Sequence, residues 1–253
     1  MGRLSVIAFW ALLGALAVPG WAQRPPVEGR HGMVVSSHAI ASEIGVEILR
    51  RGGNAVDSAV AVGFALAVVY PRAGNLGGGG FMVLRMADGQ SRVIDYREAA
   101  PAAAGRDVYL DEDGQIVPGA STLGYRAVGI PGTVAGLAHV LEGFGTMELA
   151  DVIEPARRLA ADGFTVTPPF EASLRKYAGA LGDDPESRRI FLNEGRLWTS
   201  GELFVQTDLA KTLERIRRRG CDDFYRGETA AMIVEAMERN NGLITAEDLT
   251  DYR

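Results

Sequence analysis

Residues 55–69 read AVDSAVAVGFALAVV and are apolar on nearly every side. The run predicts a helix, which Asn54 or Asp57 is placed to open and Pro71 to end. A helix that is apolar on every face is buried on every face, so we expect this one to lie inside a sandwich of layers. Its many small side chains favour close approach to neighbouring backbone.

The segments on either side predict how this helix is covered. Before it, residues 32–37 (GMVVSS) predict a short buried strand, and Ser36 or Ser37 is expected to cap a helix with Ile40, Ile44 and Ile48 on one stripe. After it, residues 81–86 and 91–97 predict two strands joined by a hairpin turn at Asp88-Gly89.

The second half of the chain is predicted to be rich in helix. Small and turn residues dominate residues 99–131, and helical patterns then follow one another. A capping box from Thr245 to Asp248 opens a further helix. The expected helices before that one cover residues 133–142, 148–161, 170–181, 208–219 and 228–239.

The first 22 residues have the layout of a cleavable secretory signal. Arg3 precedes an apolar run at residues 4–18, which is shorter than the about 20 residues that a spanning helix needs. Gly20 and Ala22 are the small residues expected before a cleavage site. We expect export to the periplasm or the cell exterior, no stable membrane span after cleavage, and a mobile leader at residues 23–30. A retained anchor is the alternative.

Composition excludes several classes of function. The 253 residues carry a net charge of −6 and include only two lysines, Lys176 and Lys211. The negative net charge argues against nucleic-acid binding, and the scarcity of lysine argues against a P-loop. Cys221 is the single cysteine, so no internal disulfide can form, and its acidic neighbours should raise the pKa of its thiol. Three histidines without metal-ligand spacing predict no metal, and we expect no cofactor.

The most unusual stretch is residues 74–82, GNLGGGGFM. Its glycines permit positive φ and expose backbone N–H groups, so it could cradle an anion. However, its register does not match G-x-G-x-x-G, and a strand rather than a helix follows it. A tight strand entry where two backbones touch is therefore the favoured interpretation. We give this structural role to Gly74, Asn75, Gly77, Gly78, Gly79 and Gly80.

Arg97 is the best candidate for substrate binding. It ends the second predicted strand within residues 94–101, IDYREAAP, where a guanidinium can reach out and bind a carboxylate bidentately. Glu98 could orient it, although neighbours on a strand point to opposite faces. A surface ion pair is the alternative. A nucleophile is not found, because residues 119–123 (GASTL) lack the second glycine of G-x-S-x-G and no histidine has a catalytic spacing.

Five segments in order resemble the gamma-glutamyltransferases, also called gamma-glutamyltranspeptidases or glutathione hydrolases. They are SSHAIASEIGVEILRRGGNAVDSAVA, GNLGGGGFM, IDYREAAP, AVGIPG and LITAEDLTDYR, and the likeness runs from about His31 to Arg253. The resemblance implies an N-terminal-nucleophile hydrolase of α+β class. Its fold is a four-layer α-β-β-α sandwich, which would be incomplete here.

The resemblance also implies a mechanism. The precursor cuts itself so that a Thr begins a small subunit, and that Thr attacks the γ-glutamyl amide of glutathione or a related donor with its own amino group as base. Water or an acceptor then releases the γ-glutamyl group. Arg97 is implied to bind the α-carboxylate of the donor, and Glu98 to support it.

The departure from the family concerns the nucleophile. No Thr-His pair occurs in the chain, whereas the family's small subunit begins with a Thr-Thr-His type of sequence. We therefore expect residues 31–253 to be a partial domain, the front of the large subunit, which needs the missing C-terminal part or small subunit and is inactive alone. Two alternatives remain open: a non-catalytic module that binds amino acids or γ-glutamyl compounds, and a related acylase acting on glutaryl-cephalosporins.

Overall fold

The structure, a computed structural model, describes residues 26–253, and helix α3 (Ala55–Val69) lies in the middle of its core. The predicted signal peptide lies outside the described residues. Asn54 caps α3 by accepting hydrogen bonds from the N–H groups of Val56 and Asp57, and the Asp57 carboxylate accepts the Asn54 N–H at 2.6 Å. The predicted helix and its start are thus confirmed. Its burial is nearly complete, because only Ala55 and Ala59 are exposed.

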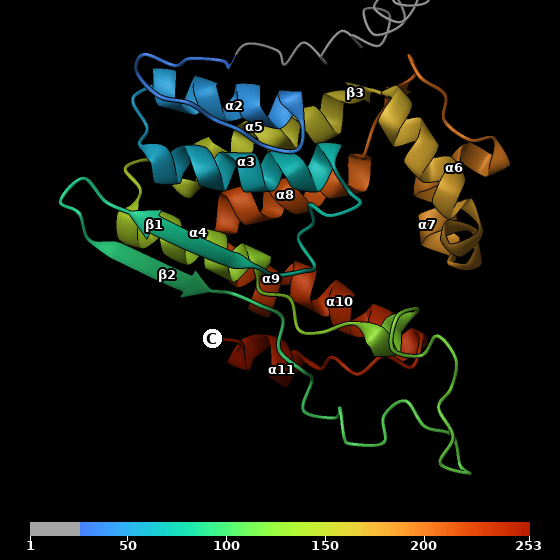
Figure 1. Cartoon of the computed structure of the whole chain (residues 1–253). Coiled ribbons are helices and arrows are strands. Elements are labelled where there is room, and N and C mark those ends of the chain that lie inside the picture. The colour runs from blue at the N-terminus through green and yellow to red at the C-terminus, as the bar shows by residue number, and fades with distance from the viewer. Residues whose placement is uncertain (1–25) are drawn as a thin grey trace, which may run out of the picture. The chain divides into compact units, whose positions relative to one another are not determined.

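Helices cover α3 on several sides within the unit formed by residues Val34–Arg253. Helix α2 (Ala39–Arg50) packs along α3, and α5 (Leu149–Asp162) lies against both α3 and α8 (Thr207–Arg219) (Figure 1). Helix α4 (Thr133–Phe144) also packs on α3, with Leu137 against Gly63. The small side chains of α3 therefore allow the close approach that the sequence predicts.

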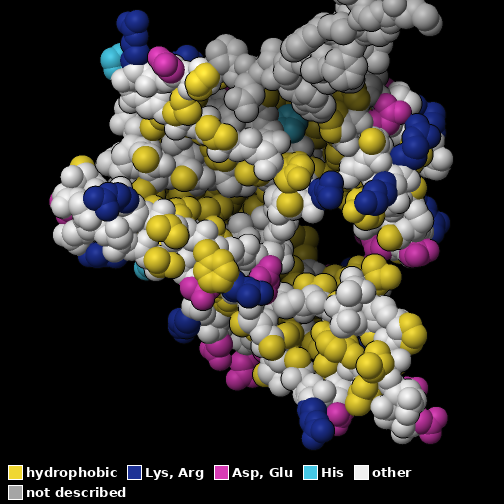
Figure 2. Space-filling model, in the orientation of Figure 1, with side chains coloured by type: hydrophobic (Ala, Val, Ile, Leu, Met, Phe, Trp, Pro, Cys, Tyr) yellow, Lys and Arg dark blue, Asp and Glu magenta, His cyan; other side chains and the backbone are white. Residues whose placement is uncertain are grey.

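The predicted hairpin forms from β1 (Phe81–Arg85) and β2 (Ser91–Asp95), which pair antiparallel with Val83 opposite Val93. Gly89 in the turn has a φ of 85°. Alternate side chains divide between the two faces of the hairpin. Leu84 is buried in the core, whereas Phe81, Val83 and Val93 are exposed. Figure 2 shows hydrophobic side chains gathered over this hairpin.

The remaining elements confirm the helix-rich second half. Five predicted helices match α4, α5, α6 (Pro168–Asp183), α8 and α10 (Glu228–Arg239), and the Thr245 capping box opens α11 (Ala246–Asp251). Two short helices were not predicted, α7 (Pro185–Phe191) and α9 (Cys221–Arg226). Each directly follows another helix, so its pattern merges with that of its neighbour. A short sheet pairs β3 (Phe164–Thr165) with β4 (Leu203–Phe204).

The predicted strand at residues 32–37 is wrong. These residues have no regular structure, and the side chains of Met33 and Val35 are 52% and 82% exposed. A strand needs a hydrogen-bonded neighbour, and the described residues provide none here. The predicted serine cap is also wrong. His38 is the N-cap residue of α2 and its side chain makes no capping hydrogen bond. The Ser36 hydroxyl accepts the N–H of His38 at 3.3 Å and lies 2.8 Å from the Ser42 hydroxyl, so it contacts the first turn without accepting a backbone N–H of the helix.

The described residues therefore form an α+β structure with two two-stranded sheets. None of the helices described is long and apolar enough to cross a membrane.

Candidate functional site

Arg97 lies just beyond β2, where four distant segments of the chain meet. Residues 74–80, here called the glycine loop, enter β1, and residues 96–98 leave β2. Gly80 and Tyr96 exchange N–H···O bonds of 3.3 and 3.0 Å, which extend the hairpin ladder by one pair. Residues 129–132, which lead into α4, and Tyr252 near the end of the chain complete the cluster.

The glycine loop touches the backbone of the Arg97 segment directly. A Cβ atom at Gly79 would lie 2.5 Å from the Tyr96 carbonyl oxygen and 2.8 Å from the Glu98 nitrogen. A Cβ at Gly74 would collide with the Leu66 carbonyl in α3. None of the glycines of this loop has a positive φ. The loop therefore needs glycine for close backbone contact.

The carbonyl oxygen of Gly78 accepts hydrogen bonds at the start of α4. It accepts the N–H groups of Gly132 and Thr133 at 2.7 and 2.9 Å. Asn75 lies beside Gly78, so a Cβ atom added at Gly78 would collide with the Asn75 side chain. A Cβ atom added at Gly77 would meet nothing within 4 Å. The loop thus connects the hairpin to α4 through hydrogen bonds that leave the Gly132 and Thr133 N–H groups unavailable to an anion.

The main chain of Arg97 is fixed, while its side chain is exposed. Its N–H donates to the Asp95 carboxylate at 3.0 Å, and its carbonyl oxygen accepts the Tyr252 hydroxyl at 2.7 Å. The guanidinium carbon lies 5.8 Å from the centre of the Phe81 ring, within the range of a cation–π contact. In the described part of the chain no carboxylate comes within 4.0 Å of this guanidinium. Arg97 therefore has the capacity to bind an external carboxylate.

Glu98 follows Arg97 but forms no ion pair with it. Its side chain is exposed and lies beside Gly129, where an added Cβ would be 3.0 Å from the Glu98 Cβ. The next residue, Ala99, exchanges backbone hydrogen bonds of 3.2 and 2.8 Å with Ile130. The backbone on both sides of Glu98 is thus held, and its carboxylate is free to face a ligand.

Two tyrosines of this cluster were not among the predicted site residues. The ring of Tyr252 stacks on that of Tyr225 at 5.8 Å and 12°. Tyr225 donates its hydroxyl to the Pro131 carbonyl at 2.8 Å and accepts the Ala135 N–H at 3.2 Å. Burial raises the pKa of both phenols further above neutral pH, where a phenol is protonated and can donate. The motif LTDYR contains Tyr252, but no local pattern shows that it reaches Arg97.

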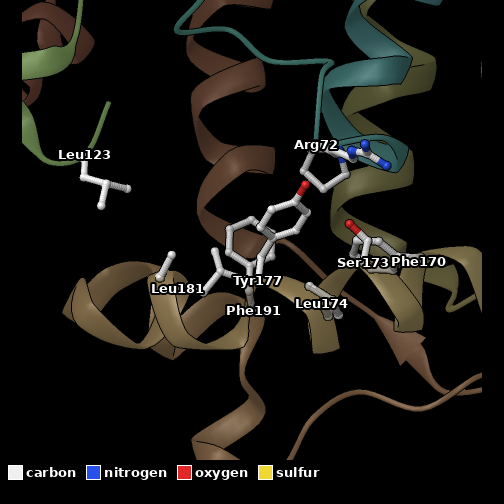
Figure 3. A pocket seen from close by; sticks show the side chains of 10 residues that line it. Arg72, Leu123, Phe170, Ser173, Leu174, Tyr177, Leu181 and Phe191 are labelled. Carbon is white, nitrogen blue, oxygen red and sulfur yellow. The ribbon is translucent and has the colours of Figure 1, made fainter. Parts of the chain in front are cut away.

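Several hollows open on the described part of the chain, and two of them border α6 and α7 or the glycine loop. One of about 520 Å³ is lined by apolar side chains of α6 and α7, with the rings of Tyr177 and Phe191 near its centre and Arg72 to one side (Figure 3). Gly74 and Asn75 line another of about 420 Å³ near the start of α8. Neither lining includes Arg97 or Glu98, whose side chains are exposed.

The thiol of Cys221 is not activated. Burial is the main cause that raises its pKa, and the negative charge of Asp222 adds to it. The predicted direction is confirmed, although burial rather than the acidic neighbours dominates. Among residues 26–253 no group of His, Cys, Asp and Glu side chains is arranged to hold a metal ion.

Comparisons with known proteins agree with the sequence resemblance. A family model described as Gamma-glutamyltranspeptidase matches residues 41–253. The Glutathione hydrolase proenzyme of Escherichia coli (strain K12) is 48% identical over 229 residues, which cover 90% of this chain and 40% of that protein. The solved structure of Helicobacter pylori gamma-glutamyltranspeptidase matches with a TM-score of 0.88 and 44% identity, over 90% of this chain and 66% of that one.

A further relative has a different name. The Acylase ACY 1 proenzyme of Pseudomonas sp. (strain SE83) is 38% identical over 237 residues, which cover 91% of this chain and 42% of that protein. The chain therefore spans less than half of the length of these two curated relatives.

Proposed function

The chain belongs to the gamma-glutamyltranspeptidase family, and from this premise we propose that it supplies donor binding to an enzyme that hydrolyses or transfers γ-glutamyl groups. Glutathione and related γ-glutamyl amides are the substrates of this proposal. Arg97 binds the α-carboxylate of the donor, and Glu98 supports it from the adjacent position. The glycine loop serves as structural support.

One observation carries the proposal. The Arg97 guanidinium is exposed and has no carboxylate partner in the described part of the chain, although its main chain is hydrogen-bonded on both sides. A planar guanidinium held in this way can bind a carboxylate through two parallel N–H···O bonds.

The proposed reaction needs a nucleophile that we do not find in this sequence. No Thr-His pair occurs among the 253 residues, and none of the three histidines has a catalytic spacing. We expect residues 23–253 by themselves to bind a donor without cleaving it. Release of p-nitroaniline from a γ-glutamyl anilide by these purified residues would contradict this expectation.

The finer features of fold and location belong to the same proposal. The hairpin β1–β2 contributes to an α-β-β-α sandwich, which the exposed Phe81, Val83 and Val93 support because such side chains normally face another layer. Residues 1–22 act as a cleavable signal that directs export, and residues 23–30 lead into the domain at residues 31–253.

Calorimetric titration with L-glutamate tests the role of Arg97. We expect Arg97→Gln to weaken binding by about 10- to 100-fold, because it removes hydrogen bonds between charged groups. Arg92→Gln is the matched control, since Arg92 lies on the same hairpin and bonds only to its neighbours Gln90 and Ser91. Glu98→Gln should weaken binding less than Arg97→Gln. Equal affinities for the parent chain and Arg97→Gln would refute the proposed site.

A second candidate function is that of an acylase, because a relative named Acylase ACY 1 proenzyme is 38% identical, and the resemblance leaves a glutaryl substrate open. Glutarate has the chain of glutamate without the α-amino group, so the two ligands separate these functions. Preference for L-glutamate supports the γ-glutamyl function, and preference for glutarate supports the acylase. A complete protein that binds L-glutamate but never cleaves a γ-glutamyl donor would be a binding module.

A further inference from the structure

The hydroxyl group of Tyr252 holds the carbonyl oxygen of Arg97. The two atoms are 2.7 Å apart and join residues separated by 155 positions in the chain. The hairpin ladder ends one residue earlier, at the pair of Gly80 and Tyr96. The hydrogen bond from Tyr252 therefore fixes the peptide group that follows Arg97. At this point the hydrogen-bond ladder of the hairpin has already ended.

Tyr252 is itself held by the core. Its ring stacks on Tyr225, which is only 6% exposed. The Tyr225 hydroxyl bonds to the Pro131 carbonyl and the Ala135 N–H, so this ring is tied to the start of α4. Gly132 leaves room for the Tyr252 hydroxyl, because an added Cβ would collide with it. The hydroxyl thus has a defined place relative to Arg97.

The Arg97 side chain has a second support. Its guanidinium lies over the Phe81 ring, at 5.8 Å from the ring centre. A flexible arginine loses side-chain freedom when it binds a carboxylate bidentately, and this loss weakens binding. A fixed backbone below and an aromatic ring beside the side chain reduce that loss, because they restrict Arg97 before the ligand arrives.

We propose that Tyr252 is a positioning residue for Arg97, which fixes its backbone so that the guanidinium is ready to bind the carboxylate of the donor. The inference rests on the function proposed for Arg97. In this role Tyr252 acts through the backbone of Arg97, which accepts its hydroxyl group.

The test uses the 253-residue chain and its Tyr252→Phe variant, in which the ring remains to stack on Tyr225. Nuclear magnetic resonance follows the Arg97 side-chain Nε–H group, first without ligand and then during titration with L-glutamate. The second ligand is 4-aminobutyrate, which lacks the α-carboxylate. Tyr125→Phe is the control, because it removes a phenolic hydroxyl that bonds to Asp184, in another part of the fold.

We expect Tyr252→Phe to weaken L-glutamate binding by about three- to tenfold, the effect of one hydrogen bond, and to leave any binding of 4-aminobutyrate unchanged. Without ligand, the Nε–H group of Arg97 should become more mobile in Tyr252→Phe and keep its mobility in Tyr125→Phe. A purely structural role would lower the melting temperature without changing this mobility.

The two proposals fail in different ways. If Arg97→Gln binds L-glutamate as well as the parent chain does, or if the parent chain binds none, the function proposed for Arg97 fails. If Arg97→Gln loses binding but Tyr252→Phe does not, only the positioning role fails. Unchanged mobility of the Arg97 side chain in Tyr252→Phe also overturns the positioning role, whether or not the chain binds a ligand.

Discussion

Two glycines of the same loop should respond in opposite ways to substitution by alanine. A Cβ at Gly79 would lie 2.5 Å from the Tyr96 carbonyl oxygen, 2.8 Å from the Glu98 nitrogen and 2.9 Å from the Arg97 carbonyl carbon. These are backbone atoms of a hydrogen-bonded hairpin, so no side-chain rotation relieves the contact. A Cβ at Gly77 would meet no atom within 4 Å, and its φ is not positive.

The expected magnitudes follow from these contacts. Gly79→Ala should lower the free energy of unfolding by about 1–3 kcal/mol, the usual cost of overpacking a close contact. Gly77→Ala should leave it unchanged or raise it by about 0.4–1 kcal/mol, because alanine restricts the unfolded chain. Urea denaturation of the two variants measures the difference. If Gly79→Ala were as stable as Gly77→Ala, the loop would not need glycine for backbone contact, and an anion-binding role would regain support.

Two further predictions concern Asp57 and Cys221. Asp57→Asn should lower the free energy of unfolding by about 2–4 kcal/mol in urea at pH 7, because the N–H groups of Thr146 and Met147 lose the charged acceptor that the buried Asp57 side chain provides. Burial acts to raise the pKa of Asp57, but its hydrogen bonds outweigh this and lower it below 3.8, so the difference should shrink as pH falls below about 4. Iodoacetamide should modify Cys221 more slowly in the folded chain than in urea, and equal rates would contradict its raised pKa.

Local sequence patterns were sufficient to predict the elements that are determined by residues close in the sequence. The apolar run of α3, its Asn54 cap and the Asp88-Gly89 turn each have their reason within a few residues, and each forms where it is predicted. The strand predicted at residues 32–37 depends on a partner, which hydrophobicity cannot supply, and it does not form. The helix α9 begins after Gly220, whose φ of 74° separates it from α8, and sequence periodicity alone does not show this break.

The site was predicted only in part for the same reason. The position of Arg97 at a strand end can be inferred from its neighbours in sequence, and the structure places it just beyond β2. The group that fixes its carbonyl oxygen lies 155 residues later. No local rule joins Tyr252 to Arg97, because their meeting depends on how α4, α9 and α11 pack together.

The convergence at Arg97 gives a physical reason why these particular motifs indicate the family together. GNLGGGGFM supplies Gly79, whose backbone touches the Arg97 segment, and IDYREAAP contains that segment. AVGIPG supplies Gly132, which donates to Gly78 and makes room for the hydroxyl that LTDYR provides through Tyr252. Each motif meets another through close backbone contacts or hydrogen bonds. Four stretches that look independent in the sequence therefore meet around the backbone of Arg97.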